Sequence, residues 1–147
     1  MDVNRNTTAV ILAAGFGRRL RPLTNTVAKS MIPVDGRPIL FRLIDQMRSL
    51  GVAKIVVVVG HLADDVVRAV RREFDDSSIE FVFNDQYSQT NNIFSLWLAR
   101  QHLVGRCRSL LLVELDSVLA GALEERYAGV QGVRVINGIS SPSLPRA

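Results

Sequence analysis

Short apolar runs alternate along this chain with segments of helical spacing, and no other feature restricts the possible folds as strongly. The runs are AVILAA at 9–14, KIVVVVG at 54–60 and SLLLVEL at 109–115. They lack the every-second-residue alternation of a half-exposed strand and are rich in branched side chains. This composition is typical of strands that are covered on both faces. IEFVFN at 79–84 predicts a further, weaker strand.

The intervening segments predict helices. In PILFRLIDQMRSLG, Pro38 suits the first helical position and Gly51 suits the stop. One apolar stripe is expected on this helix, made of Ile39, Leu40, Leu43, Ile44, Met47 and Leu50. A second helix is expected at 63–74, with acidic residues first and arginines last, as the helix dipole favours. A third is expected at 93–103, after a polar loop.

Strands that alternate with helices predict an α/β fold, with a doubly wound, mostly parallel sheet and helices on both faces. We expect one domain over residues 1–147. If the first three strands run outward in order and the fourth returns beside the first, the switch point lies between strands one and four. Ligands bind there, beyond the carboxyl ends of the strands. The segment from Gly15 to Arg19 follows the first strand, and Asp116 follows the fourth.

Composition excludes several classes of protein. A hydrophobic fraction of 48% with 22% charged residues is that of a globular protein, not a disordered one. The net charge of +4 favours an anionic partner, but basic blocks of the nucleic-acid kind are absent. The single cysteine, Cys107, excludes an internal disulfide, so we expect a cytoplasmic location. No apolar run is long enough to cross a bilayer, so no membrane partner is expected.

The glycine pair in AAGFGRRLRPL marks a loop that can present backbone N–H groups to phosphate oxygens. Taken alone, such a pair is more often an ordinary tight turn. The dinucleotide-binding pattern GxGxxG is not completed, because position 20 is leucine, and neither GKS nor GKT occurs. Arg18, Arg19, Arg21 and Lys29 gather within reach of this loop, which favours a polyphosphate ligand.

The longer string LAAGFGRRLRPLTNTVAKSMIPVDGRPIL at 12–40 resembles the signature of the sugar-nucleotide and phosphocholine nucleotidyltransferase superfamily. The departures are Ala28, where the family usually has proline, and Met31 in place of leucine. FNDQYSQTNNIFSLWLARQHL, followed by LLLVELDSVL, resembles the choline-phosphate cytidylyltransferase branch. The resemblance covers residues 9–120 and leaves 121–147 unassigned. It implies a Rossmann-like or glycosyltransferase-A-like fold that is shortened at its C-terminal end.

The resemblance also implies roles for individual residues. Arg19 would bind the triphosphate, Lys29 would bind the α-phosphate or the acceptor phosphate, and Asp116 would hold Mg²⁺. The end of the first strand and its glycine loop would contact the nucleotide through Leu12, Ala13, Ala14, Gly15 and Gly17. Asn91 and Asn92 would contact the base or the acceptor head group. Asp116 has an alternative role as the cap of the following helix, ALEERY. Arg18 and Arg21 are expected in solvent, Phe94 and Trp97 in the core, and Tyr87 in a turn.

The reaction implied is transfer of a nucleotidyl group, with CMP favoured, from a nucleoside triphosphate to a phosphomonoester such as phosphocholine or a sugar phosphate. A phosphomonoester is largely ionised at neutral pH, so no general base is required, and His61 and His102 are expected to be structural. Members of the superfamily usually continue further and carry another Asp, whereas only Glu124 and Glu125 follow Asp116 here. A homo-oligomer that completes the site, a catalytically impaired nucleotide-binding relative and an unrelated doubly wound binding module therefore stay open.

Overall fold

The computed structural model describes residues 7–103, 110–114, 117–126, 128–129 and 133–137. Its contacts divide the chain into two compact units, Met1–Arg106 and Cys107–Ala147. The prediction of one domain over the whole chain stays a prediction.

The first unit is built on a parallel sheet of three strands in the order β1-β4-β5. These strands are β1 (Thr8–Ala13), β4 (Lys54–Val59) and β5 (Ile79–Phe83). Ala13 pairs with Val59, and Val59 pairs with Phe83, so the strands end at one edge of the sheet. The predicted outward order of the first three strands is confirmed. The predicted return of the fourth strand to the side of β1 stays a prediction.

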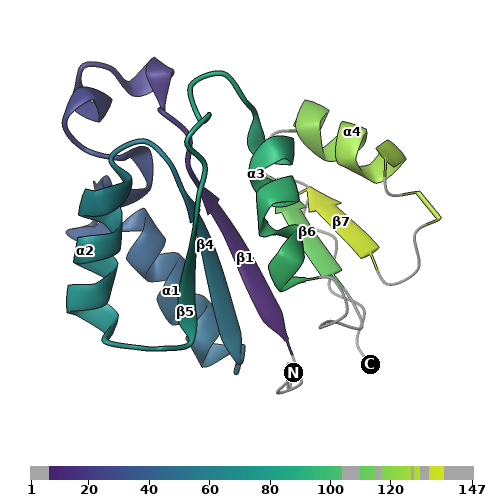
Figure 1. Ribbon diagram of the computed structural model, residues 1–147, viewed down its shortest axis with the longest axis horizontal. Helices are drawn as coiled ribbons and strands as arrows, with labels where there is room; N and C mark the ends of the chain where they lie inside the picture. The colour runs from purple at the N-terminus through teal and green to yellow at the C-terminus, as the bar shows by residue number, and fades with distance from the viewer. Residues whose placement is uncertain (1–6, 104–109, 115–116, 127, 130–132, 138–147) are drawn as a thin grey trace. The chain divides into compact units, whose positions relative to one another are not determined.

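Helices cover both faces of this sheet, as Figure 1 shows. Ile55, Val57 and Val59 of β4 pack in one core with α1 (Ile39–Ser49) and α2 (Ala63–Phe74). Val56 and Val58 pack in a second core with Ala99 of α3 (Asn92–Ala99). All five of these β4 side chains are fully buried, which explains why the strand is apolar from Ile55 to Val59.

The first helix differs in detail from its prediction. Pro38 is the N-cap of α1 and not its first helical residue, because its ψ of 140° is extended. Leu40 and Ile44 are fully buried, but Ile39, Leu43 and Leu50 of the expected stripe are more than a third exposed. Phe41 is buried beside them, where its ring meets that of Phe74 edge-on at 5.3 Å. The buried face of α1 is therefore rotated toward α2 relative to the predicted stripe.

Several short elements lie in the segment that joins β1 to α1 and contains the glycine loop. They are three 3₁₀ turns, η1 (Arg18–Leu20), η2 (Leu23–Asn25) and η3 (Lys29–Met31), and an antiparallel pair, β2 (Pro33–Val34) with β3 (Arg37–Pro38). A fourth 3₁₀ turn, η4 (Arg100–His102), continues α3. The first three turns were not predicted, because each is only one turn long and has no apolar period. The fourth lies within the helix predicted at 93–103, whose α-helical part ends at Ala99.

The second unit pairs β6 (Leu110–Glu114) in parallel with β7 (Val133–Asn137), joined through α4 (Ser117–Arg126). The run at 109–115 predicted β6, and α4 begins before the predicted ALEERY segment. Asp116 lies outside the described residues, so neither its predicted metal role nor its alternative role as a helix cap is tested. Among the residues that the structure describes, no helix is both long and apolar enough to cross a membrane.

Candidate functional site

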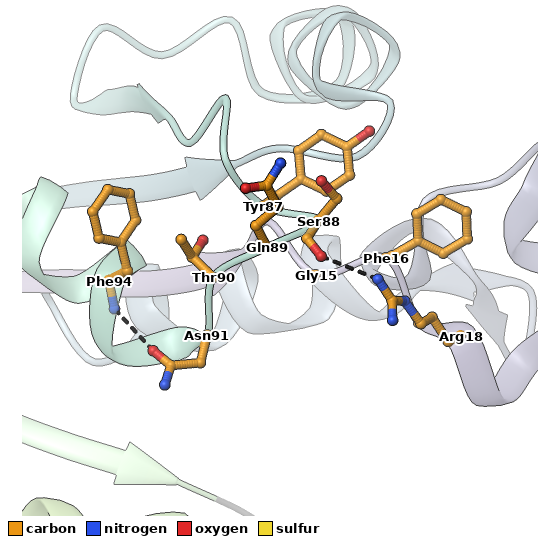
Figure 2. A pocket seen from close by; sticks show the side chains of 10 residues that line it. Gly15, Phe16, Arg18, Tyr87, Ser88, Gln89, Thr90, Asn91 and Phe94 are labelled. Atoms are coloured by element: carbon orange, nitrogen blue, oxygen red, sulfur yellow. Dashed lines mark hydrogen bonds between the residues drawn. The ribbon is translucent and has the colours of Figure 1, made fainter.

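A cavity of about 620 Å³ lies where the loops that follow β1 and β5 meet (Figure 2). The loop after β1 contributes Gly15, Phe16, Gly17 and Arg18, and the loop between β5 and α3 contributes residues 87–91. Phe94 of α3 completes the lining. The cavity lies beyond the carboxyl ends of the strands, as predicted, but between the loops of β1 and β5. The predicted site between the first and fourth strands stays a prediction. Three of the predicted nucleotide-binding residues line it: Gly15, Gly17 and Asn91.

Gly17 is the residue of this loop that needs to be glycine. Its φ of 70° is left-handed, and an ideal Cβ there would lie 3.0 Å from Cβ of Lys29 and 3.1 Å from Cγ2 of Thr24. The hydroxyl of Thr24, which is fully buried, donates to the Gly17 carbonyl at 3.0 Å. Gly17 and Lys29 are therefore packed against each other, so the glycine loop and the predicted catalytic lysine are neighbours in space.

His61 braces this loop from beneath. The buried imidazole donates from Nε2 to the Thr24 carbonyl at 2.7 Å, and its ring lies 4.0 Å from that of Phe16. The ring of Tyr87, on the opposite loop, lies 5.8 Å from the His61 ring. The expectation that His61 is structural agrees with this burial, but its contacts with both lining loops had no signal in the sequence.

The apolar residues before the loop serve the core. Ala13 and Ala14 are buried, one in each of the two cores, and Leu12 packs beside Ala14. The Ala14 carbonyl accepts a hydrogen bond from the backbone N–H of His61 at 3.1 Å. None of these three residues lines the cavity, so their predicted contact with a nucleotide stays a prediction.

Asn91 caps the helix beside the cavity. Its Oδ1 accepts from the backbone N–H groups of Ile93 at 3.1 Å and Phe94 at 3.3 Å. Figure 2 shows the bond to Phe94. The carbonyl oxygen of its side chain is thus used by α3, as is usual for an Asn at this position. Asn92 is the first residue of α3 and does not line the cavity. Contacts of either asparagine with a base or head group stay a prediction.

Two aromatic predictions are corrected. Trp97 is not a core residue, because it is 51% exposed and the Arg100 guanidinium stacks over its ring at 3.7 Å. Phe94 is half-buried and lines the cavity. Tyr87, expected as a turn residue, also lines the cavity and is packed against Gly60. The cavity therefore has aromatic faces on both of its lining loops.

The basic residues near the glycine loop differ from several of those elsewhere in having no carboxylate partner among the described residues. Arg18, Arg19, Arg21 and Lys29 are exposed, and within the described ranges none forms an ion pair with a carboxylate. Several cations elsewhere are neutralised by nearby acids: Arg37 by Asp45 and Glu73, Arg48 by Asp76, and Lys54 by Glu80. The glycine loop therefore carries a concentrated positive charge that would attract an anion.

The groups with shifted pKa values are members of ion pairs, and none of them lines the cavity. Hydrogen bonds to Asp45 and Glu73 raise the pKa of Arg37. A hydrogen bond from Lys54 is the main cause of a lowered pKa of Glu80, which also meets His102 at 2.9 Å. These pairs lie on the surface, where solvent screening leaves such contacts little effect on stability.

The described residues do not form a metal site by themselves. No group of three metal-ligating side chains occurs among them, and no carboxylate is found among the residues that line the cavity. Mg²⁺ commonly takes one or two carboxylates together with phosphate oxygens and water. The predicted role of Asp116 in holding a metal stays a prediction, because this residue lies outside the described ranges.

Comparison with known proteins identifies relatives. A family described as "MobA-like NTP transferase domain" matches residues 9–127. The chain is 37% identical over 139 residues to CMP-5'-(3-aminopropyl)phosphonate synthase of Streptomyces rubellomurinus, covering 95% of this chain and 22% of the relative. It is 34% identical over 99 residues to choline-phosphate cytidylyltransferase of Streptococcus pneumoniae, covering 65% of this chain and 40% of the relative.

A solved structure agrees with these matches. The CTP:phosphocholine cytidylyltransferase of Streptococcus pneumoniae superposes with a TM-score of 0.59 and 34% identity, over 66% of this chain and 41% of that one. The chain thus spans less than half the length of each of these relatives.

Proposed function

The chain belongs to the MobA-like NTP transferase domain family, and from this premise we propose that it transfers a nucleotidyl group to a phosphorylated small molecule. CMP is the favoured group and CTP the favoured donor, because the two curated relatives described above are both named for cytidine nucleotides or their transfer. The acceptor is a phosphomonoester or phosphonate, such as phosphocholine or an aminoalkylphosphonate. Pyrophosphate is the second product.

One observation of this structure supports the proposal above the others. The loop that carries Gly15 and Gly17 lines a cavity beside four basic residues that lack a carboxylate partner among the described residues. A nucleoside triphosphate and a phosphorylated acceptor are both strongly anionic, and bringing them together is the main barrier to their reaction. Cations at the loop would lower that barrier.

The proposed reaction needs charge and position more than proton transfer. An oxygen of the acceptor's phosphoryl group attacks the α-phosphorus of the triphosphate, a new P–O bond forms, and the bond to the leaving pyrophosphate breaks in line. Lys29 and Arg19 stabilise the negative charge on the phosphates. The attacking oxygen is already ionised near neutral pH, so His61 can remain a structural brace.

Mg²⁺ is proposed as the cofactor, and Asp116 as the residue that would hold it together with the phosphates. When bound, the ion would neutralise phosphate charge. The aromatic faces of Tyr87 and Phe94 line the cavity, and a nucleotide base of any kind can stack on such faces. The proposed preference for cytidine rests on the named relatives alone.

The proposal is tested by measuring pyrophosphate release. The chain is mixed with each of the four common nucleoside triphosphates and with phosphocholine, 2-aminoethylphosphonate or glucose 1-phosphate. Release is expected to be fastest with CTP and to stop when EDTA removes Mg²⁺. Saturable binding of magnesium CTP without release from any pair would instead support a nucleotide-binding relative that does not turn over. Absence of both binding and release would contradict the proposed function.

A glycine substitution provides a second check. Gly17→Ala places a Cβ at 3.0 Å from Lys29, and Gly36→Ala, with φ of 76°, places one in open space. Both changes strain a left-handed residue, at a cost of about 1 kcal/mol in stability. Only Gly17→Ala is expected to weaken magnesium CTP binding, by about tenfold, because it displaces the lysine from the loop. Isothermal titration of both variants measures this difference, and equal losses of affinity would refute it.

A further inference from the structure

Arg18 links the two loops that line the cavity. Its side chain extends from η1, directly after the glycine loop, and Nη2 donates to the carbonyl oxygen of Ser88 at 3.0 Å. Figure 2 shows this bond between the two loops, with both residues among those that line the cavity. The partners are 70 residues apart in the chain, so the contact is purely tertiary.

Arg18 also supplies the charge of the cavity. Among the lining residues that the structure describes, it is the one with a formally charged side chain. Its bonded partner is a neutral carbonyl oxygen, and no carboxylate in the described part of the chain pairs with it. A guanidinium has five N–H donors and no acceptor, so the bond to Ser88 leaves most of its donors available.

We propose that the Arg18 guanidinium binds a phosphoryl group of the substrate while its bond to Ser88 holds it at the cavity. This inference rests on the proposed function and extends it, because the resemblance assigns the phosphates to Arg19 and Lys29 and leaves Arg18 in solvent. A planar guanidinium binds two phosphoryl oxygens through a fork of parallel hydrogen bonds. A guanidinium that is already held in place loses less conformational entropy on binding.

The chemistry of the lining favours a phosphoryl group over other parts of the substrates. The free N–H groups require an oxygen acceptor, and a negative one gives the strongest hydrogen bonds. A quaternary or primary ammonium, as in phosphocholine or an aminoalkylphosphonate, would be repelled by the guanidinium. Arg18 would therefore orient such an acceptor with its phosphoryl end toward the cation, and it would bind the phosphates of a nucleotide in the same way.

The experiment compares ligands that share parts of one structure. Binding of CTP, cytidine, phosphocholine and inorganic pyrophosphate is measured by calorimetry for the unchanged chain, Arg18→Gln and Arg18→Lys. Arg72→Gln is the matched control, because it removes the same charge from an exposed position of α2, away from the cavity. The melting temperature of each variant is recorded, so that loss of folding is recognised.

If Arg18 binds a phosphoryl group of the nucleotide, Arg18→Gln weakens CTP and pyrophosphate binding about tenfold and leaves cytidine binding unchanged. If it binds the acceptor instead, the tenfold loss appears with phosphocholine. Arg18→Lys retains the charge without the fork and is expected to recover only part of the affinity. Arg72→Gln is expected to change each affinity less than twofold.

Two results would overturn the inference. Equal losses for CTP and cytidine would show that Arg18 acts only by holding the Ser88 loop. Unchanged binding of CTP, phosphocholine and pyrophosphate in Arg18→Gln would show that it contacts no phosphoryl group. Pyrophosphate separates this inference from the proposed function: if the chain binds it through Arg18 but binds no nucleotide, the inference stands and the proposed function fails.

Discussion

Replacing Lys29 with alanine is expected to lower the rate of pyrophosphate release from CTP and its acceptor by about a hundredfold to a thousandfold. The substitution removes an ammonium group proposed to act on the reacting phosphates. It keeps the Cβ that lies against Gly17, so the glycine loop keeps its packing. Stability should therefore change little while catalysis falls. Steady-state rates at saturating CTP, together with a melting curve, measure the two effects separately.

Lys54→Ala is the matched control for this substitution, because Lys29 and Lys54 are the two lysines of the chain. Lys54 lies at the start of β4, at the opposite end of the strand from Gly60, and pairs with Glu80 at 2.7 Å. Its loss should leave the rate within about twofold and cost less than about 1 kcal/mol of stability. A Lys29→Ala rate equal to that of Lys54→Ala would remove Lys29 from the proposed mechanism.

Gly60→Ala is expected to destabilise the first unit by about 2–3 kcal/mol and to lower its melting temperature by about 5–10 °C. Gly60 lies between β4 and His61, where an ideal Cβ would be 2.7 Å from Cβ of Tyr87 and 2.8 Å from the carbonyl oxygen of Ala14. That carbonyl is held by the His61 N–H, so backbone and side chain must both move. Thermal denaturation followed by circular dichroism measures the loss.

The same variant should also disturb the cavity, because Tyr87 is part of its lining. Gly15→Ala separates stability from binding: a Cβ at Gly15 meets no atom within 4 Å and the residue has no positive φ, so its melting temperature should be unchanged. Gly15 nevertheless lines the cavity, and its Cβ would project where a ligand approaches the backbone. A Gly60→Ala melting temperature equal to that of Gly15→Ala would contradict the packing described here.

The comparison between sequence and structure is clearest at the strands. The run at 54–60 predicted a strand covered on both faces, and β4 occupies 54–59 with Ile55, Val57 and Val59 in one core and Val56 and Val58 in the other. The sequence predicts this pattern because successive side chains of a strand point to opposite faces of the sheet. The motif at 12–40 located the glycine loop in the same way, through local residues alone.

Predictions failed where a residue's surroundings come from distant parts of the chain. Trp97 was expected in the core because of its spacing from Phe94, yet it is half exposed under Arg100. Arg18 is exposed, as expected, but it also lines the cavity and bonds to Ser88, which the sequence did not indicate. An aromatic or basic residue carries no local signal of which loop will face it. The predictions that depend on Asp116 lie outside the described residues.

The amino-acid sequence alone determined the order of strands and helices, the parallel class of the sheet and the position of the glycine loop. These follow from hydrophobic periodicity and from glycine's backbone freedom, which act between near neighbours in the chain. Only the tertiary structure decided that His61 braces the loop, that Gly60 has no room for a side chain, and that Arg18 reaches Ser88. Each of those contacts joins segments far apart in sequence, so it exists only once the sheet has brought its strand ends together.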